Sequence, residues 1–204
     1  MALATYTDLL ASVASYLHRS DLTANIPDFV VLAEARIARD LRIRKQITTT
    51  TLTAIAGNQA LVLPSDWLEL ENLSVNVSPA RNLVYMTVEQ LDGKYPTNNY
   101  TGTPAVYTIE ADSLLFGPTP DAAYSIGLIY YARFPVLSVA TTNWLMTNHP
   151  GIYLFSTLAE AAPFIGNDER IAVWDAKYRA DFQALQNQDD RATHSGSALR
   201  VQRI

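Results

Sequence analysis

Three carboxylates, Asp66, Glu69 and Glu71, lie close together in the sequence and are the side chains best suited to act as a catalytic acid and base. A pair of carboxylates can hydrolyse a glycosidic bond, so a small cell-wall hydrolase is one interpretation. Glu69 and Glu71 alternate, however, and alternation on a strand is equally the pattern of a solvated strand face. Asp168 and Glu169 suit a helix N-terminus, where acids cap the helix and complement its dipole. No serine has the glycine frame of a nucleophile elbow, and we expect no enzymatic activity.

The chain contains few residues that could bind a metal ion or a cofactor. The chain contains no cysteine, which excludes disulfides and thiolate ligands. Its histidines, His18, His149 and His194, are far apart, and none has a partner at helical spacing. No phosphate-binding glycine loop occurs among the eight glycines. The sequence therefore predicts no metal site and no cofactor.

The densest basic cluster lies at the end of the second predicted helix and consists of Arg36, Arg39, Arg42, Arg44 and Lys45. One interpretation is a solvated face whose arginines pair with Glu34 and Asp40. Another is a subunit interface in which Arg36, Arg39 and Arg42 meet the acidic β region of a neighbouring copy, because bidentate arginine–carboxylate pairs fix register between subunits. An alternative function is a nucleic-acid-binding accessory domain that contacts phosphate through residues 36–45.

The elements that must position these residues begin and end with helices. A first helix, capped by Thr5, is predicted up to His18, and a second covers roughly residues 27–42. Helical periodicity returns after Pro150. The last helix carries an apolar stripe that is wide enough to require a covering partner and consists of Ile171, Trp174, Tyr178, Phe182 and Leu185.

Between the helices, β-branched residues alternate with turn residues. Residues 47–63 predict a hairpin around Gly57 and Asn58, closed by Pro64. A short helix is predicted at residues 87–91. Further strands are predicted at residues 68–77, 106–110, 114–116 and 124–134.

Together these patterns predict an α+β fold. Residues 1–45 and 143–191 form a discontinuous helical bundle, and residues 46–142 form an inserted antiparallel β sandwich or barrel-like domain. Residues 192–204 form a flexible C-terminal arm.

Charge is unevenly distributed along the chain, whose formal net charge is −5. Residues 46–142 contain three basic and eight acidic side chains. A protein that grips nucleic acid through phosphate shows the opposite bias. No run approaches the roughly 20 apolar residues that cross a bilayer, and the N-terminus lacks a secretion signal. We therefore expect neither specific DNA binding nor a membrane partner.

The C-terminal arm combines apolar and basic residues. Leu199, Val201 and Arg203 lie on one side of an extended chain, so that apolar and basic side chains stand together. At about 3.3 Å per residue, residues 192–204 could span about 40 Å. Such a segment suits docking on the strand edge or groove of another protein.

Several sequence segments, taken in their order along the chain, resemble those of the head-to-tail adaptor (connector) proteins of tailed bacteriophages, including the tail tubular protein A type of short-tailed phages. Each segment alone is weak evidence for the resemblance, while their order is more specific. Together they span about residues 6–182. These segments are Tyr6-Thr7-Asp8-Leu9-Leu10, Ile26-Pro27-Asp28-Phe29 through Leu41-Arg42, Leu63-Pro64-Ser65-Asp66-Trp67-Leu68-Glu69-Leu70, Gly102-Thr103-Pro104-Ala105-Val106-Tyr107-Thr108-Ile109, Asn143-Trp144-Leu145 and Pro150-Gly151-Ile152-Tyr153-Leu154-Phe155.

This resemblance implies a non-enzymatic virion protein of the neck and tail, assembled in the host cytoplasm. Such adaptors form a homo-oligomeric ring, usually a dodecamer, beneath the portal protein. The helical part is expected to meet the portal and neighbouring copies, and the β part to face the tail or nozzle protein. Genomic DNA passes through the bore without specific binding. We expect the arm to order only on the portal, through Leu199, Arg200, Val201, Arg203 and Ile204.

Overall fold

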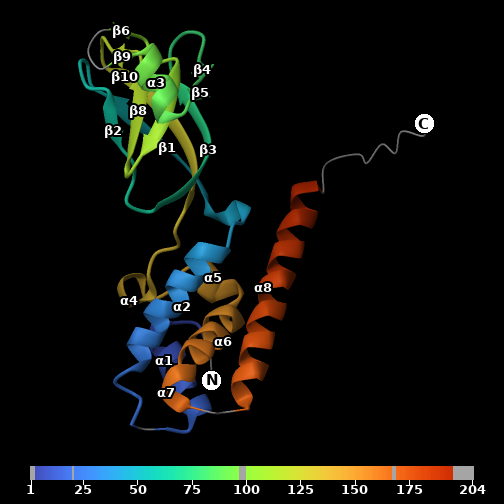
Figure 1. Ribbon diagram of the computed structural model, residues 1–204. Coiled ribbons are helices and arrows are strands. Elements are labelled where there is room, and N and C mark those ends of the chain that lie inside the picture. The colour runs from blue at the N-terminus through green and yellow to red at the C-terminus, as the bar shows by residue number, and fades with distance from the viewer. Residues whose placement is uncertain (1–2, 20, 97–99, 167–168, 195–204) are drawn as a thin grey trace. The chain divides into compact units, whose positions relative to one another are not determined.

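The computed structural model describes residues 3–19, 21–96, 100–166 and 169–194. Its contacts divide the chain into two units. The helical unit is formed by Met1–Arg44 with Phe134–Ile204, and the β unit is formed by Lys45–Arg133 (Figure 1). The predicted α+β fold is confirmed.

The helical unit contains two long N-terminal helices and a C-terminal group of helices. The long helices α1 and α2 are joined by a short connection. The elements are α1 (Tyr6–Leu17), α2 (Ile26–Asp40), α4 (Leu137–Ala140), α5 (Trp144–Asn148), α6 (Pro150–Glu160), α7 (Ala162–Ile165) and α8 (Arg170–His194).

Helix α6 is central to this unit and contacts α1, α2, α5 and α8. Its buried residues include Ile152, Tyr153 and Leu158, which share one apolar core with Phe29 of α2 and Trp174 of α8. A helix that is apolar on nearly every side must be covered by others, which explains this position. The apolar stripe on α8 finds its predicted partner here.

Local capping explains where the first helix begins. The backbone N–H of Asp8 donates to Oγ1 of Thr5 at 3.2 Å, and the N–H of Thr5 donates to the Asp8 carboxylate at 3.0 Å. This reciprocal capping box satisfies N–H groups that have no partner within the helix. The predicted cap of α1 is therefore confirmed, and the helix ends at His18 in the left-handed region, with φ 53°.

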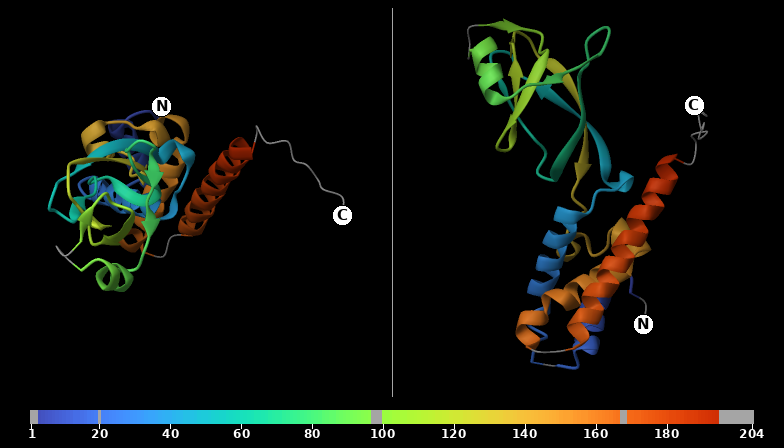
Figure 2. Two further views of the ribbon diagram at one scale, coloured as in Figure 1. Left: turned by 90° about the horizontal axis from the view of Figure 1, so that it is seen from above. Right: turned by 45° about the vertical axis from the view of Figure 1, so that its right-hand side comes forward.

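Helix α8 continues to His194, past Arg191, where the sequence predicts the end of the helical part. Its C-terminal end projects beyond the other helices of the helical unit (Figures 1 and 2). The last turns of α8 therefore offer surface that its own unit does not cover.

A turn of 3-10 helix at Arg44–Gln46 spans the boundary between the two units, and the β unit contains one short helix, α3 (Val88–Lys94). Its strands are β1 (Ile47–Ala54), β2 (Ala60–Val62), β3 (Trp67–Val75), β4 (Arg81–Asn82), β5 (Val84–Tyr85), β6 (Thr101–Gly102), β7 (Val106–Glu110), β8 (Ser113–Gly117), β9 (Thr119–Pro120) and β10 (Tyr124–Ala132).

Two four-stranded sheets share a common apolar core. Their strand orders are β1-β10-β3-β4 and β2-β8-β7-β5. Residues from both sheets, including Leu73 and Leu128 of the first and Leu114 and Phe116 of the second, form one cluster. This is the arrangement of a sandwich.

The predicted hairpin at residues 47–63 is wrong, because β1 pairs with β10 in one sheet and β2 pairs with β8 in the other. The pairing is also not wholly antiparallel, since β5 runs parallel to β7 and β6 parallel to β9.

Candidate interaction surfaces

Arg36 forms the centre of a charged cluster between α2 and the C-terminal helices. Its guanidinium donates to Asp175 of α8 at 2.7 Å and to Glu160 of α6 at 3.4 Å. It also lies over the ring of Tyr178, 4.2 Å from the centroid. Only 19% of the side chain is exposed. Arg36 therefore joins elements of its own chain.

Electrostatics within this cluster follow from those contacts. The hydrogen bond from Arg36 lowers the pKa of the Asp175 carboxyl below its usual value, although partial burial opposes it. Arg179 adds a second ion pair to Asp175 at 2.7 Å. The cluster is thus a fixed network that attaches α8 to α2 at neutral pH.

The other arginines of the basic cluster differ in what they contact. Arg42 donates to the carbonyl oxygens of Ala38 and Leu41 and so caps the end of α2. Arg44 binds Asp189 of α8 through its side chain at 3.1 Å. Arg39 is 71% exposed and pairs with its neighbour in sequence, Asp40, at 2.9 Å. Of the three arginines predicted at a subunit interface, Arg39 is the one that points to solvent.

Glu34 does not form the predicted pair with these arginines. Its carboxylate accepts a hydrogen bond of 2.7 Å from the backbone N–H of Leu137, at the start of α4. Burial raises the pKa of Glu34, and the hydrogen bond from Leu137 offsets part of that rise. Glu34 therefore stabilises a helix start more than a hundred residues away in sequence.

The three carboxylates that could act in catalysis, Asp66, Glu69 and Glu71, have different surroundings. Asp66 accepts a hydrogen bond of 3.0 Å from the hydroxyl of Tyr130, and burial with this bond raises the pKa of Tyr130 to about 12. Glu69 is exposed on β3 opposite Tyr131. Glu71 is also exposed but lies at a register shift and has no counterpart on β10. Glu69 and Glu71 are therefore exposed side chains on the surface of a strand.

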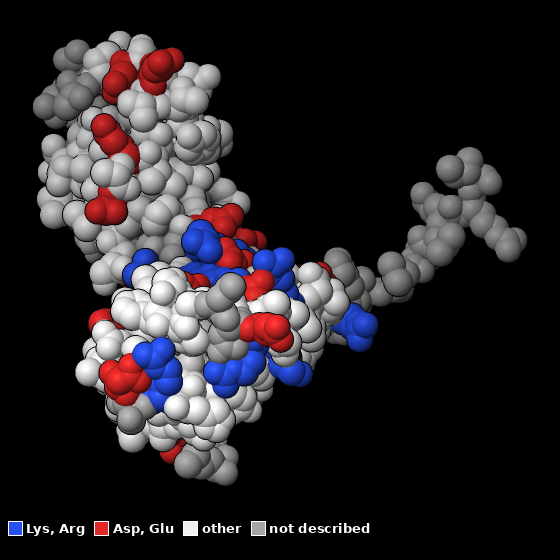
Figure 3. Space-filling view, turned by 60° about the horizontal axis from the view of Figure 1, so that its bottom comes forward, with Lys and Arg blue, Asp and Glu red and all other residues white. Residues whose placement is uncertain are grey.

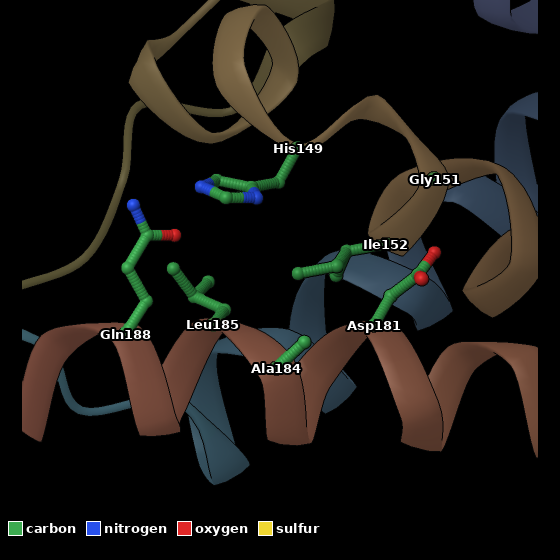
Figure 4. Close-up of a pocket in the computed structure, with 7 residues that line it drawn as sticks. All are labelled: His149, Gly151, Ile152, Asp181, Ala184, Leu185 and Gln188. Atoms are coloured by element: carbon green, nitrogen blue, oxygen red, sulfur yellow. The ribbon is translucent and has the colours of Figure 1, made fainter.

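A pocket of about 210 Å³ lies between α8 and the start of α6. Asp181 and Gly151 stand at one end, and His149 and Gln188 stand at the other (Figure 4). Its floor is apolar and consists of Ile152, Ala184 and Leu185. Sequence reasoning missed this site, because its lining joins α8 to residues some thirty positions earlier in the chain.

Most of the β unit's surface that Figure 3 shows is uncharged, and the charged side chains over most of that face are acidic. The second sheet exposes large apolar side chains at both edges. Val62 of β2 is 70% exposed, and Val84 and Tyr85 of β5 are 60% and 58% exposed. Edge strands with exposed apolar residues are surfaces on which other proteins dock.

Within the described residues, no three His, Asp or Glu side chains are grouped so as to hold a metal ion. No helix in the same ranges has the length and apolarity required to cross a membrane. The predicted docking residues Leu199, Arg200, Val201, Arg203 and Ile204 lie outside the described residues.

Comparison with known proteins identifies the family. No curated protein matches the chain. The family model described as the SU10 adaptor protein matches residues 4–202, which is nearly the whole chain. The match includes both the helical unit and the β unit. The chain therefore belongs to the SU10 adaptor protein family and is a structural adaptor protein of a bacteriophage.

Proposed function

We propose that this protein is a head-to-tail adaptor, similar to the tail tubular protein A type, which assembles as a closed ring of twelve copies between the portal protein and the tail. The ring is completed in the host cytoplasm and becomes part of the virion neck. Genomic DNA passes through its bore without specific binding. The observation that carries this proposal is the family match over residues 4–202.

The division of the chain supports this role. A closed ring uses a heterologous interface, in which one surface of a subunit meets a different surface of the next. The helical unit offers the exposed Arg39 on α2 and a concave pocket beside α8. The β unit offers apolar edges at Val62 and Tyr85, which suit contact with a tail or nozzle protein.

The C-terminal arm is the proposed contact with the portal. Its sequence carries Arg200 and Arg203 beside Leu199, Val201 and Ile204, and it contains no acidic residue. A short basic and apolar segment at a chain end can add itself to the edge or groove of a larger partner. Deletion of residues 195–204 is expected to weaken attachment to purified portal rings at least tenfold, whereas unchanged attachment would refute this role.

The alternative of phosphate binding by residues 36–45 receives less support. Arg36, Arg42 and Arg44 donate to groups within their own chain. Binding of duplex DNA that weakens with salt and is lost in the Arg39→Ala variant would favour the alternative.

Electron microscopy of portal rings mixed with the purified protein tests the main proposal. A second ring is expected at one end of each portal. Bare portal rings at saturating protein would contradict the proposal, and a variant that lacks residues 195–204 serves as the matched control for the docking arm.

A further inference from the structure

The pocket beside α8 contains a carboxylate without a partner. Asp181 is half-buried and makes no hydrogen bond or ion pair with the residues that the structure describes. Its Oδ2 lies so close to the backbone of Gly151 that a Cβ there would come within 2.5 Å of it. The nearest lysine on its own helix, Lys177, lies over the ring of Phe155 at 5.8 Å. The pocket therefore holds an available negative charge.

The shape of the pocket defines what it can accept. Ile152 and Leu185 form an apolar floor between Asp181 and Gln188 (Figure 4). An arginine has an aliphatic stem that packs on such a floor and a charged head that pairs with a carboxylate. An arginine side chain matches both features.

One exposed arginine of the helical unit, Arg39, is placed where it could enter such a pocket on another molecule. Arg39 continues a row on α2 with Val31 and Ala35, spaced four residues apart, and all three are exposed. Residues at this spacing form one ridge of a helix surface. Arg39 pairs with Asp40, which is adjacent in sequence and itself exposed. Such exposed pairs contribute little to stability, so the arginine can exchange its partner.

Helix α8 presents a matching row that leads into the pocket. Ala172, Ala176, Ala180 and Ala184 are exposed at four-residue spacing, and Gln188 continues the row. Ala184 and Gln188 also line the pocket. Small side chains leave a shallow groove into which a ridge from another helix can pack. From Ala176 to Ala184 this groove rises about 12 Å, as does the ridge from Val31 to Arg39.

We infer that the occupant is a second copy of this chain: the Val31–Ala35–Arg39 ridge of one subunit packs on the alanine row of the next, and Arg39 enters the pocket to pair with Asp181. The inference rests on the proposed ring and identifies its interface. The contact is heterologous, because ridge and pocket lie on different helices, and repetition of it can close a ring.

Cross-linking tests the contact directly, because the chain has no cysteine. Arg39→Cys and Gln188→Cys are introduced in separate chains, which are mixed on portal rings with a short bis-maleimide reagent. Covalent dimers are expected from this mixture. The control mixture replaces Gln188→Cys with Val139→Cys, a position on α4 that is 81% exposed. Equal yields from the two mixtures would overturn the inference.

Charge exchange separates this inference from the proposed function. Arg39→Asp and Asp181→Lys are each expected to reduce the ring fraction on portals about tenfold or more, because like charges then face each other. The double variant should recover most of it. Arg19→Asp, the same change elsewhere on the helical unit, should have no effect. Normal rings from Arg39→Asp would overturn the interface and leave the ring intact as a proposal. Absence of rings in the wild-type protein would instead refute the proposed function.

Discussion

At position 36, one arginine connects three helices of the helical unit. Its ion pairs reach α6 and α8, and its guanidinium covers Tyr178. Arg39, one turn later, forms no such contact with the described residues beyond its ion pair with its neighbour Asp40. Two arginines that look alike in the sequence thus have separate roles. One stabilises the subunit, and the other is free to serve an interface.

Replacement of Arg36 tests this division. Arg36→Met keeps most of the aliphatic stem but leaves Asp175 and Glu160 without their shared cation, so we expect the free energy of unfolding to fall by about 2 kcal/mol. Arg39→Met is the matched control and should change it by less than about 0.5 kcal/mol. Urea unfolding followed by circular dichroism measures both. Equal losses in the two variants would contradict the assignment.

Acidification tests the same network through Asp175. Because its pKa is lowered in the folded protein, its contribution is fully present above the unfolded pKa of about 3.9 and is lost as the pH falls through the folded pKa. Wild-type protein should therefore exceed Asp175→Asn in stability at pH 6, and the difference should shrink towards pH 3. The urea midpoints of both proteins at the two pH values give the measurement. A constant difference would show that the carboxylate charge is unimportant.

At the scale of elements, the β unit depends on a close approach between α3 and β8. A Cβ on Gly117 would lie 2.6 Å from the ring of Tyr95, which follows α3, and 2.9 Å from a methyl group of Val106. Gly93 within α3 has no atom within 4 Å of its added Cβ. The two glycines therefore provide a matched pair.

We expect Gly117→Ala to destabilise the β unit by about 1–3 kcal/mol, because the ring and the methyl group must move. Gly93→Ala should stabilise the protein by up to about 1 kcal/mol, because alanine is the better helix former and space is available. Thermal unfolding of the two variants distinguishes these signs. A loss of similar size in both would show that the close packing at Gly117 has no energetic consequence.

Elements with strong local signals could be predicted from the sequence. Thr5 and Asp8 cap α1, Pro150 starts α6, and alternation marks β7 and β10. The pairing of strands could not be predicted in this way. The signal at Gly57 suggests a hairpin, yet β1 pairs with β10, which is about 75 residues away in sequence, and β2 belongs to the other sheet. Long-range packing overrides a turn signal here.

The contacts of the candidate interface could not be predicted from local sequence either. Helical spacing offers Glu34 and Asp40 as partners for the arginines, but only the pair of Arg39 with Asp40 is formed. The acids that bind Arg36 lie on α6 and α8, and no local rule connects them. The pocket at Asp181 is likewise made by helices that meet only in the folded chain.

At the scale of the whole molecule, we propose that the two units make different contacts in the assembled neck. The helical unit carries a ridge and a pocket that suit contact between copies, and the β unit carries apolar strand edges. A subunit with different surfaces for its two neighbours can close a ring, whereas a self-complementary surface gives pairs. The family match covers residues of both units.

Mass measurement of the purified protein with and without portal rings tests the account most directly. We expect a species of 22.5 kDa for the protein alone and, on the portal, an added mass equal to a whole ring of subunits. A mass that stays at that of one subunit beside saturating portal rings would contradict it.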